Sequence, residues 1–179
     1  MKLFHLADLH IGKRVNEFSM IEDQKYILKR ILDLAEEEKP DGIILAGDIY
    51  DKQIPSAEAV QVFDEFITRL AGRAIPVFII SGNHDSAERL AFGGRLLNSR
   101  GIYLSPVYDG SVTKIPLKDQ YGTVWIHLLP FIRPSTVRHV FENEADLVTD
   151  VQTAAETVIR HMEIDLKDRN ILVAHQFVT

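Results

Sequence analysis

Several residues that can bind metal ions directly follow four short apolar stretches of the chain. In chain order they are Asp8, His10, Asp48, Asn83, His84 and His175. Carboxylate oxygens, an amide oxygen and imidazole nitrogens are ligands suited to manganese, iron or zinc. The 179 residues contain no cysteine, which excludes thiolate sites and disulfides. The sequence therefore predicts a cation site built from oxygen and imidazole ligands, provided that the fold brings these residues together.

The elements before these residues predict that they meet. Apolar runs at residues 2–7, 42–46 and 77–80 read as strands, and amphipathic segments at 20–38 and 57–71 read as helices between them. A β-α-β-α-β order implies parallel strands with right-handed crossovers. The carboxyl ends of parallel strands share one edge, where ligands bind. Gly47 and Gly82 precede two of the polar groups and are expected to allow sharp turns there.

Capping and periodicity locate the helices more closely. Ser19 and Glu22 have the spacing of a capping box for the first helix, and Pro40 follows its end. The second helix is expected to start near Ser56 and close at Gly72. The first helix has an apolar stripe that should face the core, formed by Ile27, Leu28, Ile31, Leu32, Leu34 and Ala35.

The second half of the chain is less regular. Short strands are expected at 102–104, 111–115 and 123–128, without intervening helices, which suggests an antiparallel portion or a second sheet. A long helix is predicted at 145–162 and a last buried strand at 171–174. Because the sequence stops just after that strand, we expect the domain, residues 1–179, to be incomplete at its C-terminal end.

Composition narrows the class of protein. A length of 179 residues with 46% hydrophobic residues suits one compact α/β domain. No apolar run reaches eighteen residues and no signal peptide is visible, so a cytoplasmic protein without a membrane span is expected. The net charge is −6, which argues mildly against DNA binding because affinity for DNA comes largely from neutralising phosphates.

The motifs resemble those of the calcineurin-like metallophosphoesterase family. They are Asp-x-His at 8–10, Gly-Asp-x-x-Asp at 47–51, Gly-Asn-His-Asp at 82–85 and a later single histidine, His175. The longer strings LADLHIGK (6–13), LAGDIYD (45–51) and SGNHDSAERL (81–90) resemble the SbcD branch of DNA-repair nucleases. The resemblance implies a four-layer αββα fold, a β-sandwich flanked by helices. It also implies a metal-dependent exonuclease or endonuclease that processes DNA ends in repair and recombination with an SbcC-like ATPase as partner.

The resemblance also implies roles for individual residues. Asp8 and His10 match ligands of a first metal, Asn83 and His175 match ligands of a second, Asp48 matches the bridging carboxylate, and His84 matches the catalytic histidine. Manganese is the expected metal, with iron, zinc and magnesium as alternatives. The family also uses a Gly-His-x-His motif that is absent from these 179 residues. Each metal is therefore short of one ligand, and we expect weakened binding.

Elementary chemistry agrees with these roles. Two cations roughly 3.5–4 Å apart polarise phosphoryl oxygens and lower the pKa of a bridging water. His84, if not bound to metal, would donate a proton to the leaving oxygen. Metal-bound histidines need outer partners for their second ring nitrogen. Asp51 and Asp85 are candidates for that role, although each would equally serve to cap the turn that follows.

Other surfaces carry further hypotheses. Lys13, Arg14 and Arg89 follow closely on the metal-binding loops and are candidate contacts to DNA phosphates, with ordinary solvated charge as the alternative. Helices of the region 57–71 mediate dimers in related nucleases. An exposed strip of Val62, Phe63 and Phe66 would indicate a homodimer, whereas burial against the sheet explains the same residues.

Two other functions compete with a DNA nuclease. One is a related phosphoesterase acting on a small phosphodiester or a phosphoprotein. A protein phosphatase is disfavoured because Lys52 and Gln53 follow Asp51, where that group has Arg-Gly, and because Asp85 replaces its glutamate. The other is a catalytically incomplete fragment that serves as a folding or dimerisation module.

Overall fold

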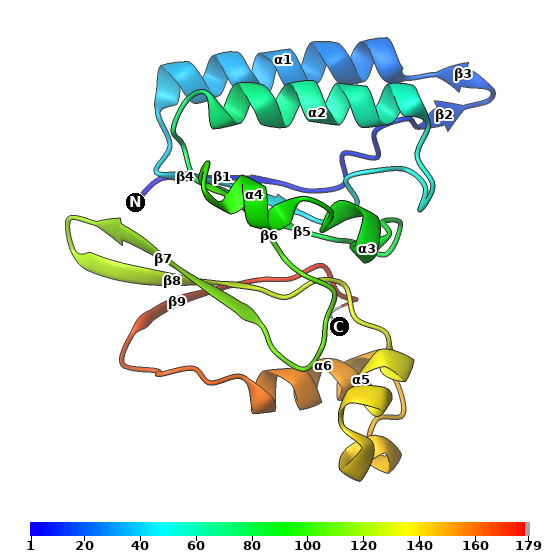
Figure 1. Ribbon diagram of the computed structural model, residues 1–179, viewed down its shortest axis with the longest axis vertical. Coiled ribbons are helices and arrows are strands. Elements are labelled where there is room, and N and C mark those ends of the chain that lie inside the picture. The colour runs from blue at the N-terminus through cyan, green and yellow to red at the C-terminus, as the bar shows by residue number, and fades with distance from the viewer. Residues whose placement is uncertain (178–179) are drawn as a thin grey trace.

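The computed structural model describes residues 1–177 and stacks them in four layers, helix on sheet on sheet on helix (Figure 1). The first sheet contains four parallel strands in the order β1-β4-β5-β6. Their bounds are Leu3–Leu6 for β1, Gly42–Ala46 for β4, Val77–Ile80 for β5 and Ile102–Leu104 for β6. The expected parallel sheet is confirmed.

Helices cover the outer face of this sheet. The two long ones are α1 (Ile21–Glu38) and α2 (Ala57–Ala71), and the short α3 (Ala87–Leu90) and α4 (Gly94–Asn98) connect β5 to β6. A small hairpin, β2 (Arg14–Val15) and β3 (Phe18–Ser19), precedes α1. Within residues 1–177, no helix combines the length and apolar character needed to cross a membrane.

The second sheet has three strands in the order β7-β8-β9. These are β7 (Thr113–Asp119), β8 (Gly122–Leu128) and β9 (Arg169–Val173). The β7–β8 pair is antiparallel and the β8–β9 pair is parallel. The helical segments α5 (Pro134–Val140), the 3-10 helix η1 (Glu142–Leu147) and α6 (Val151–His161) form the fourth layer.

The central strands β4 and β5 are buried on both faces. Ile43 and Leu45 point into a core shared with α1 and α2, whereas Ile44 and Phe78 belong to a second core shared with β8. Side chains alternate between the two faces of a strand, so only a continuous apolar sequence can fill both cores. This explains why these strands appear in the sequence as uninterrupted apolar runs.

The helix predicted at 145–162 is confirmed over Val151–His161, but its predicted start at residue 145 is wrong. The chain instead forms η1 and then begins α6 at Val151, and the start of α6 is set by a capping box. The Asp150 carboxylate accepts a hydrogen bond from the Thr153 N–H at 2.8 Å, and the Thr153 hydroxyl oxygen accepts one from the Asp150 N–H at 3.0 Å. A side chain that satisfies the first free N–H groups starts a helix at that point and excludes the residues before it. The Asp-x-x-Thr spacing was the local signal that marked this start.

Two expectations about the first helix are also wrong. Its N-cap is Met20, without a side-chain capping bond, so Ser19 and Glu22 do not form a capping box. Ile27 and Leu34 are 53% and 42% exposed, whereas Leu28 and Leu32 are buried. Residues seven apart lie along one line of a helix, and the line through 27 and 34 runs along the edge of the apolar stripe.

Two strands differ from the prediction in their bounds, whereas the second helix agrees with it. The strands at 111–115 and 171–174 are found at 113–119 and 169–173. Ser56 caps α2 through a bond from the Ala59 N–H, as expected. Val62, Phe63 and Phe66 are at most 8% exposed, so burial against the sheet accounts for them and they form no exposed strip.

We predict that one ion pair makes the second sheet sensitive to acid. Arg169 of β9 donates two hydrogen bonds of 2.7 Å to the Asp119 carboxylate at the end of β7, and this pairing holds the pKa of Asp119 well below its ordinary value of 3.8. A carboxyl whose pKa is lowered in the folded state contributes stability above its unfolded pKa and loses it as the pH falls. Arg169→Gln should therefore lower the free energy of unfolding at pH 7 more than at pH 3, measured by chemical denaturation.

The matched control is Arg30→Gln, which removes an exposed ion pair between Arg30 and Asp33 within one helix. Exposed pairs of this kind contribute little. An equal loss of stability for the two variants at pH 7 would contradict the assigned role of Arg169.

Candidate metal centre

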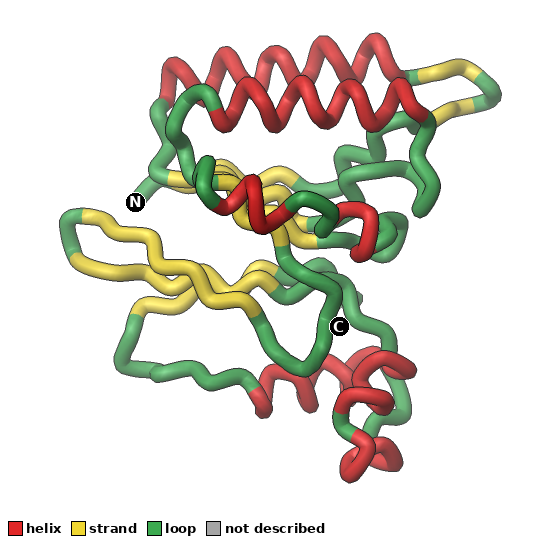
Figure 2. Tube along the Cα trace, in the orientation of Figure 1, coloured by secondary structure: helices red, strands yellow, loops and turns green. Residues whose placement is uncertain are grey.

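The loops that follow the strands gather at one end of the two sheets (Figure 2). The loop after β1 and the loop after β4 continue side by side beyond the sheet. The His10 N–H donates to the Asp48 carbonyl at 2.9 Å, and the Ile11 N–H donates to the Ile49 carbonyl at 2.9 Å. The backbone of residues 8–11 is therefore held in register with that of residues 47–49, which places their side chains together.

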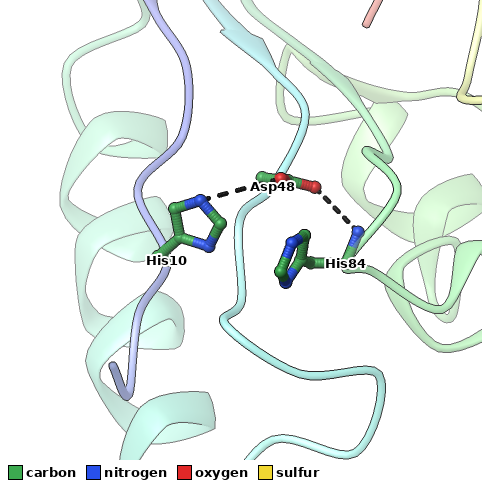
Figure 3. A group of neighbouring side chains, drawn as sticks. All are labelled: His10, Asp48 and His84. Carbon is green, nitrogen blue, oxygen red and sulfur yellow. Dashed lines mark hydrogen bonds and ion pairs between the residues drawn. The ribbon is translucent and has the colours of Figure 1, made fainter. Parts of the chain in front are cut away.

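Asp48 lies at the centre of the residues that converge here. It is 3% exposed, and one of its carboxylate oxygens lies 3.7 Å from Nε2 of His10 and 3.5 Å from Nε2 of His175. The other oxygen accepts a hydrogen bond from the His84 N–H at 2.9 Å. Figure 3 shows His10 and His84 on either side of this carboxylate. One buried carboxylate therefore joins the loop that follows β4 to the segments that follow β1, β5 and β9.

Two groups of potential metal ligands share Asp48. One consists of His10, Asp48 and His84, and the other of Asp8, Asp48 and His175; within each group the ligand atoms lie within 4.8 Å of one another. The structure thus brings together five of the six residues singled out from the sequence. The sixth, Asn83, is half-buried and lies on the same loop, between Gly82 and His84.

The geometry and chemistry of these donors fit divalent cations. Two ligand atoms that each lie about 2.1 Å from a shared ion are about 3–3.5 Å apart at the usual coordination angles. The distances around Asp48 lie at or slightly above that range. In residues 1–177, the ion-pair partners of Asp8 and Asp48 are all histidines, so no lysine or arginine neutralises these carboxylates. For the buried Asp48, an uncompensated charge of this kind is costly unless cations bind, whereas Asp8 is exposed.

The backbone of the centre is strained. Asp8, His10 and Asp48 have φ angles of 56°, 44° and 49°, in the left-handed region that residues with a Cβ seldom adopt. Such conformations cost on the order of 1–3 kcal/mol each and cluster at functional sites. Asp8, His10 and Asp48 all adopt such a conformation, which indicates that the loop conformations are selected for the direction of these side chains.

His175 is oriented by a backbone carbonyl. Its Nδ1 lies 2.7 Å from the Ala46 carbonyl oxygen. A carbonyl only accepts, so Nδ1 carries the proton, and Nε2 presents its lone pair toward Asp48. This is the outer partner that a metal-binding histidine requires. Gly47 makes room for the ring, because a Cβ at that position would lie 2.5 Å from Cγ of His175.

His10 has a less complete outer partner. Its Nδ1 is buried without a hydrogen bond in the described part of the chain, and the nearest carboxylate oxygen, from Asp51, is 3.6 Å away. Asp51 therefore lies on the side of the ring opposite Asp48, which is where an anchor of a metal-bound His10 would be needed.

His84 differs from the other two histidines because it is exposed. Its Nδ1 lies 3.0 Å from the Asp51 carbonyl oxygen, so Nδ1 is the donor. Its ring packs edge-on against His10, with centroids 4.8 Å apart. Nε2 is therefore the nitrogen left to exchange a proton or bind a ligand.

Asp85 binds backbone rather than an imidazole. Among residues 1–177, its carboxylate accepts hydrogen bonds from the N–H groups of Ile49, Tyr50 and Gly82, at 3.1, 2.9 and 2.9 Å. Burial raises the pKa of this carboxyl, although the three N–H groups act in the opposite direction. Asp85 therefore fastens the loop after β5 to the loop after β4, and it positions Asp48 and His84 indirectly.

The candidate DNA contacts lie on exposed positions. Lys13 and Arg14 belong to the turn and hairpin after His10, and the Arg14 guanidinium donates to the Glu17 carbonyl. Arg89, in α3, borders a groove next to α2. Contact of these three residues with DNA stays a prediction.

The fold and the centre are those of a phosphoesterase. The sequence matches the family described as "Calcineurin-like phosphoesterase" over residues 1–178, and the chain belongs to that family. It is 36% identical over 178 residues to the SbcD subunit of the nuclease SbcCD from Staphylococcus epidermidis (strain ATCC 12228 / FDA PCI 1200), an alignment that covers 98% of this chain and 46% of that protein. The chain thus spans just under half the length of this curated relative. A structural comparison finds YfcE, a phosphoesterase from E. coli, with 16% identity and a TM-score of 0.36 over 72% of this chain and 56% of the other.

Sequence reasoning missed two features of the centre. The Ala46 carbonyl, which orients His175, is invisible in sequence because every residue has a carbonyl. Gly82 was read as a turn residue, but its role is close approach, since a Cβ there would overlap the backbone N and carboxylate of Asp48. The sequence signal for this close approach was the position of Gly82 directly before the candidate ligand Asn83.

We predict that Gly82→Ala disrupts the centre. The added methyl group forces Asp48 to move, and overpacking of this kind costs about 1–3 kcal/mol of stability. Mn²⁺ affinity should fall by at least tenfold, as measured by isothermal titration calorimetry, because Asp48 belongs to both ligand groups. Gly94→Ala is the control, since the nearest atom to a Cβ there is 3.7 Å away. Unchanged Mn²⁺ binding in Gly82→Ala would show that Asp48 does not hold the metal.

Proposed function

We propose that this chain supplies the metal-binding core of a two-metal DNA nuclease of the SbcD type, which hydrolyses phosphodiester bonds at DNA ends during repair and recombination. The single observation that carries the proposal is the buried Asp48 carboxylate, shared by two groups of ligands. The name of the curated relative, a subunit of a nuclease, supports a nucleic acid as the substrate, and we propose DNA.

In this proposal, Asp8 and His10 would hold one cation, Asn83 and His175 would hold the other, and Asp48 would serve both. This division follows the family resemblance, whereas the two geometric groups join His10 with His84 and Asp8 with His175. Manganese is the metal we propose. The pair of cations would neutralise the charge of a phosphodiester and make water a stronger nucleophile. Asp51 lies 3.6 Å from Nδ1 of His10 and would anchor the ring of a metal-bound His10, and the Ala46 carbonyl orients His175.

His84 acts on the leaving group. With Nδ1 donating to the Asp51 carbonyl, the imidazolium form keeps a second N–H at Nε2 on an exposed edge of the ring. That N–H is available to protonate the departing oxygen, whose charge rises as the P–O bond breaks.

The overall negative charge is compatible with a DNA substrate. Bound cations reverse the local sign at the centre. Lys13, Arg14 and Arg89 would add phosphate contacts around it, which position DNA without reading its sequence. An SbcC-like ATPase as partner and a cytoplasmic location complete the proposal. A homodimer through α2 is not part of it, because Val62, Phe63 and Phe66 are buried.

The direct test is hydrolysis of linear duplex DNA and of bis-p-nitrophenyl phosphate with Mn²⁺. Because a Gly-His-x-His motif is absent from these 179 residues, Mn²⁺ is supplied at a saturating concentration. We expect both substrates to be cleaved, and cleavage to stop with a chelator. Hydrolysis of the small ester alone would contradict a DNA nuclease.

A second prediction separates the roles of the histidines. His84→Ala should lower kcat by on the order of 100-fold, the contribution of a general acid, while Mn²⁺ affinity changes less than threefold. His10→Ala should lower Mn²⁺ affinity itself. Both are measured beside His139→Ala, an exposed histidine of α5. Loss of Mn²⁺ binding in His84→Ala would make His84 a ligand and refute its catalytic role.

A further inference from the structure

Gln24 is a polar residue on the apolar face of α1. Positions three before and four after it lie on the same face of the helix, and they are occupied by Ile21 and Leu28, which are 6% and 5% exposed. Gln24 itself is half-buried. An amide among apolar side chains is unfavourable unless its polar atoms form hydrogen bonds. The partners of this amide therefore indicate why the helix carries a glutamine here.

The amide of Gln24 is bonded to the segment that carries Asp8 and His10. Its Nε2 donates to the Leu9 carbonyl at 3.2 Å and to the His10 carbonyl at 2.7 Å, and its Oε1 accepts from the Gly12 N–H at 2.9 Å. One side chain thus uses both of its N–H groups and its carbonyl oxygen on the backbone of a single loop. In the part of the chain that the structure describes, the Gly12 N–H donates to no other group.

The same segment is also bonded to the loop after β4. The N–H groups of Asp8 and His10 donate to the carbonyls of Gly47 and Asp48, at 3.2 and 2.9 Å. Asp8 and His10 have φ angles of 56° and 44°. Backbone strain of this kind persists only where the surrounding structure holds it. Two elements hold this segment: the loop after β4 through backbone groups, and α1 through the Gln24 side chain.

We infer that Gln24 is a positioning residue for the candidate metal centre. Its three hydrogen bonds hold the segment after β1 in the strained conformation that presents Asp8 and His10 to Asp48. Without the amide, the Gly12 N–H loses its acceptor and the segment relaxes toward ordinary backbone angles, which turns both side chains away from Asp48. The inference rests on the proposed function for the identity of the cation, whereas the contacts of Gln24 do not depend on it.

The first measurement is Mn²⁺ affinity by isothermal titration calorimetry. Gln24→Met keeps an unbranched side chain of similar length but removes all three hydrogen bonds. We expect the affinity to fall by on the order of tenfold, the usual effect of removing an outer partner of metal ligands. Gln24→Glu keeps an acceptor for the Gly12 N–H but turns a negative charge toward two carbonyls, so it should lower the affinity at least as much.

Leu28→Ala and Gln152→Met are the controls. Leu28→Ala empties a buried position on the same face of α1, so it should lower the melting temperature more than Gln24→Met does, yet leave the Mn²⁺ affinity unchanged. Gln152→Met makes the matched change at an exposed position of α6, where the amide donates to Glu156, and should change neither quantity. An equal fall in affinity for Leu28→Ala and Gln24→Met would overturn the positioning role.

The second measurement is nuclear magnetic resonance of the ¹⁵N-labelled 179-residue chain without metal. In Gln24→Met the Gly12 amide proton should exchange with solvent faster, because its acceptor is gone, whereas Gln24→Glu should keep it protected. The ring nitrogen signals of His10 should shift in both variants. Those of His175, whose ring the Ala46 carbonyl orients, should stay in place. A general loss of structure would instead move the signals of both histidines.

The two measurements separate this inference from the proposed function. A wild-type chain that binds no Mn²⁺, but whose His10 signals alone shift in Gln24→Met, would refute the proposed function and leave the positioning role standing. Binding of Mn²⁺ by the wild type that Gln24→Met does not weaken would refute the positioning role alone.

Discussion

The interaction on which the rest of the structure depends is the burial of the Asp48 carboxylate among loops from several strands. A buried anion is costly unless hydrogen bonds or cations compensate it. Asp48 receives an N–H from His84 on one oxygen and faces two imidazoles with the other. Each of these contacts crosses from one loop to another, so the position of Asp48 determines where the remaining ligands lie.

The architecture makes that position rigid. Strands β4 and β5 are covered by helices on one face and by the second sheet on the other, and both cores reach the residues next to the site. Asp85 then fastens the loops that leave these two strands through three backbone N–H groups. Because interiors are close-packed, the ends of buried strands move little, which is what precise placement of ligands requires.

Membership of the calcineurin-like phosphoesterase family agrees with an arrangement that gathers potential metal ligands beyond the strand ends. The centre and a cavity on the side of β5 share the loop that starts at Ser81. A single segment thus carries Asn83 and His84 and also borders this cavity.

Much of the fold was predictable because it follows local patterns. Continuous apolar runs located β4 and β5, and helical periodicity located α2 to the residue. Predictions failed where a local signal was overlooked, as with Asp150 and Thr153. Burial was also predicted wrongly for Ile27 and Leu34, because tertiary packing covers only part of the apolar stripe of α1.

The sequence by itself determined which donors end each strand, and the parallel order of the strands determined that they would share one edge. Only the tertiary structure decided which nitrogen of His175 faces Asp48, that Asp85 binds backbone N–H groups, and that Gly82 is required by the closeness of Asp48. The physical reason is distance along the chain. His175 and its partner carbonyl at Ala46 are 129 residues apart, and local periodicity carries no information about contacts over such separations.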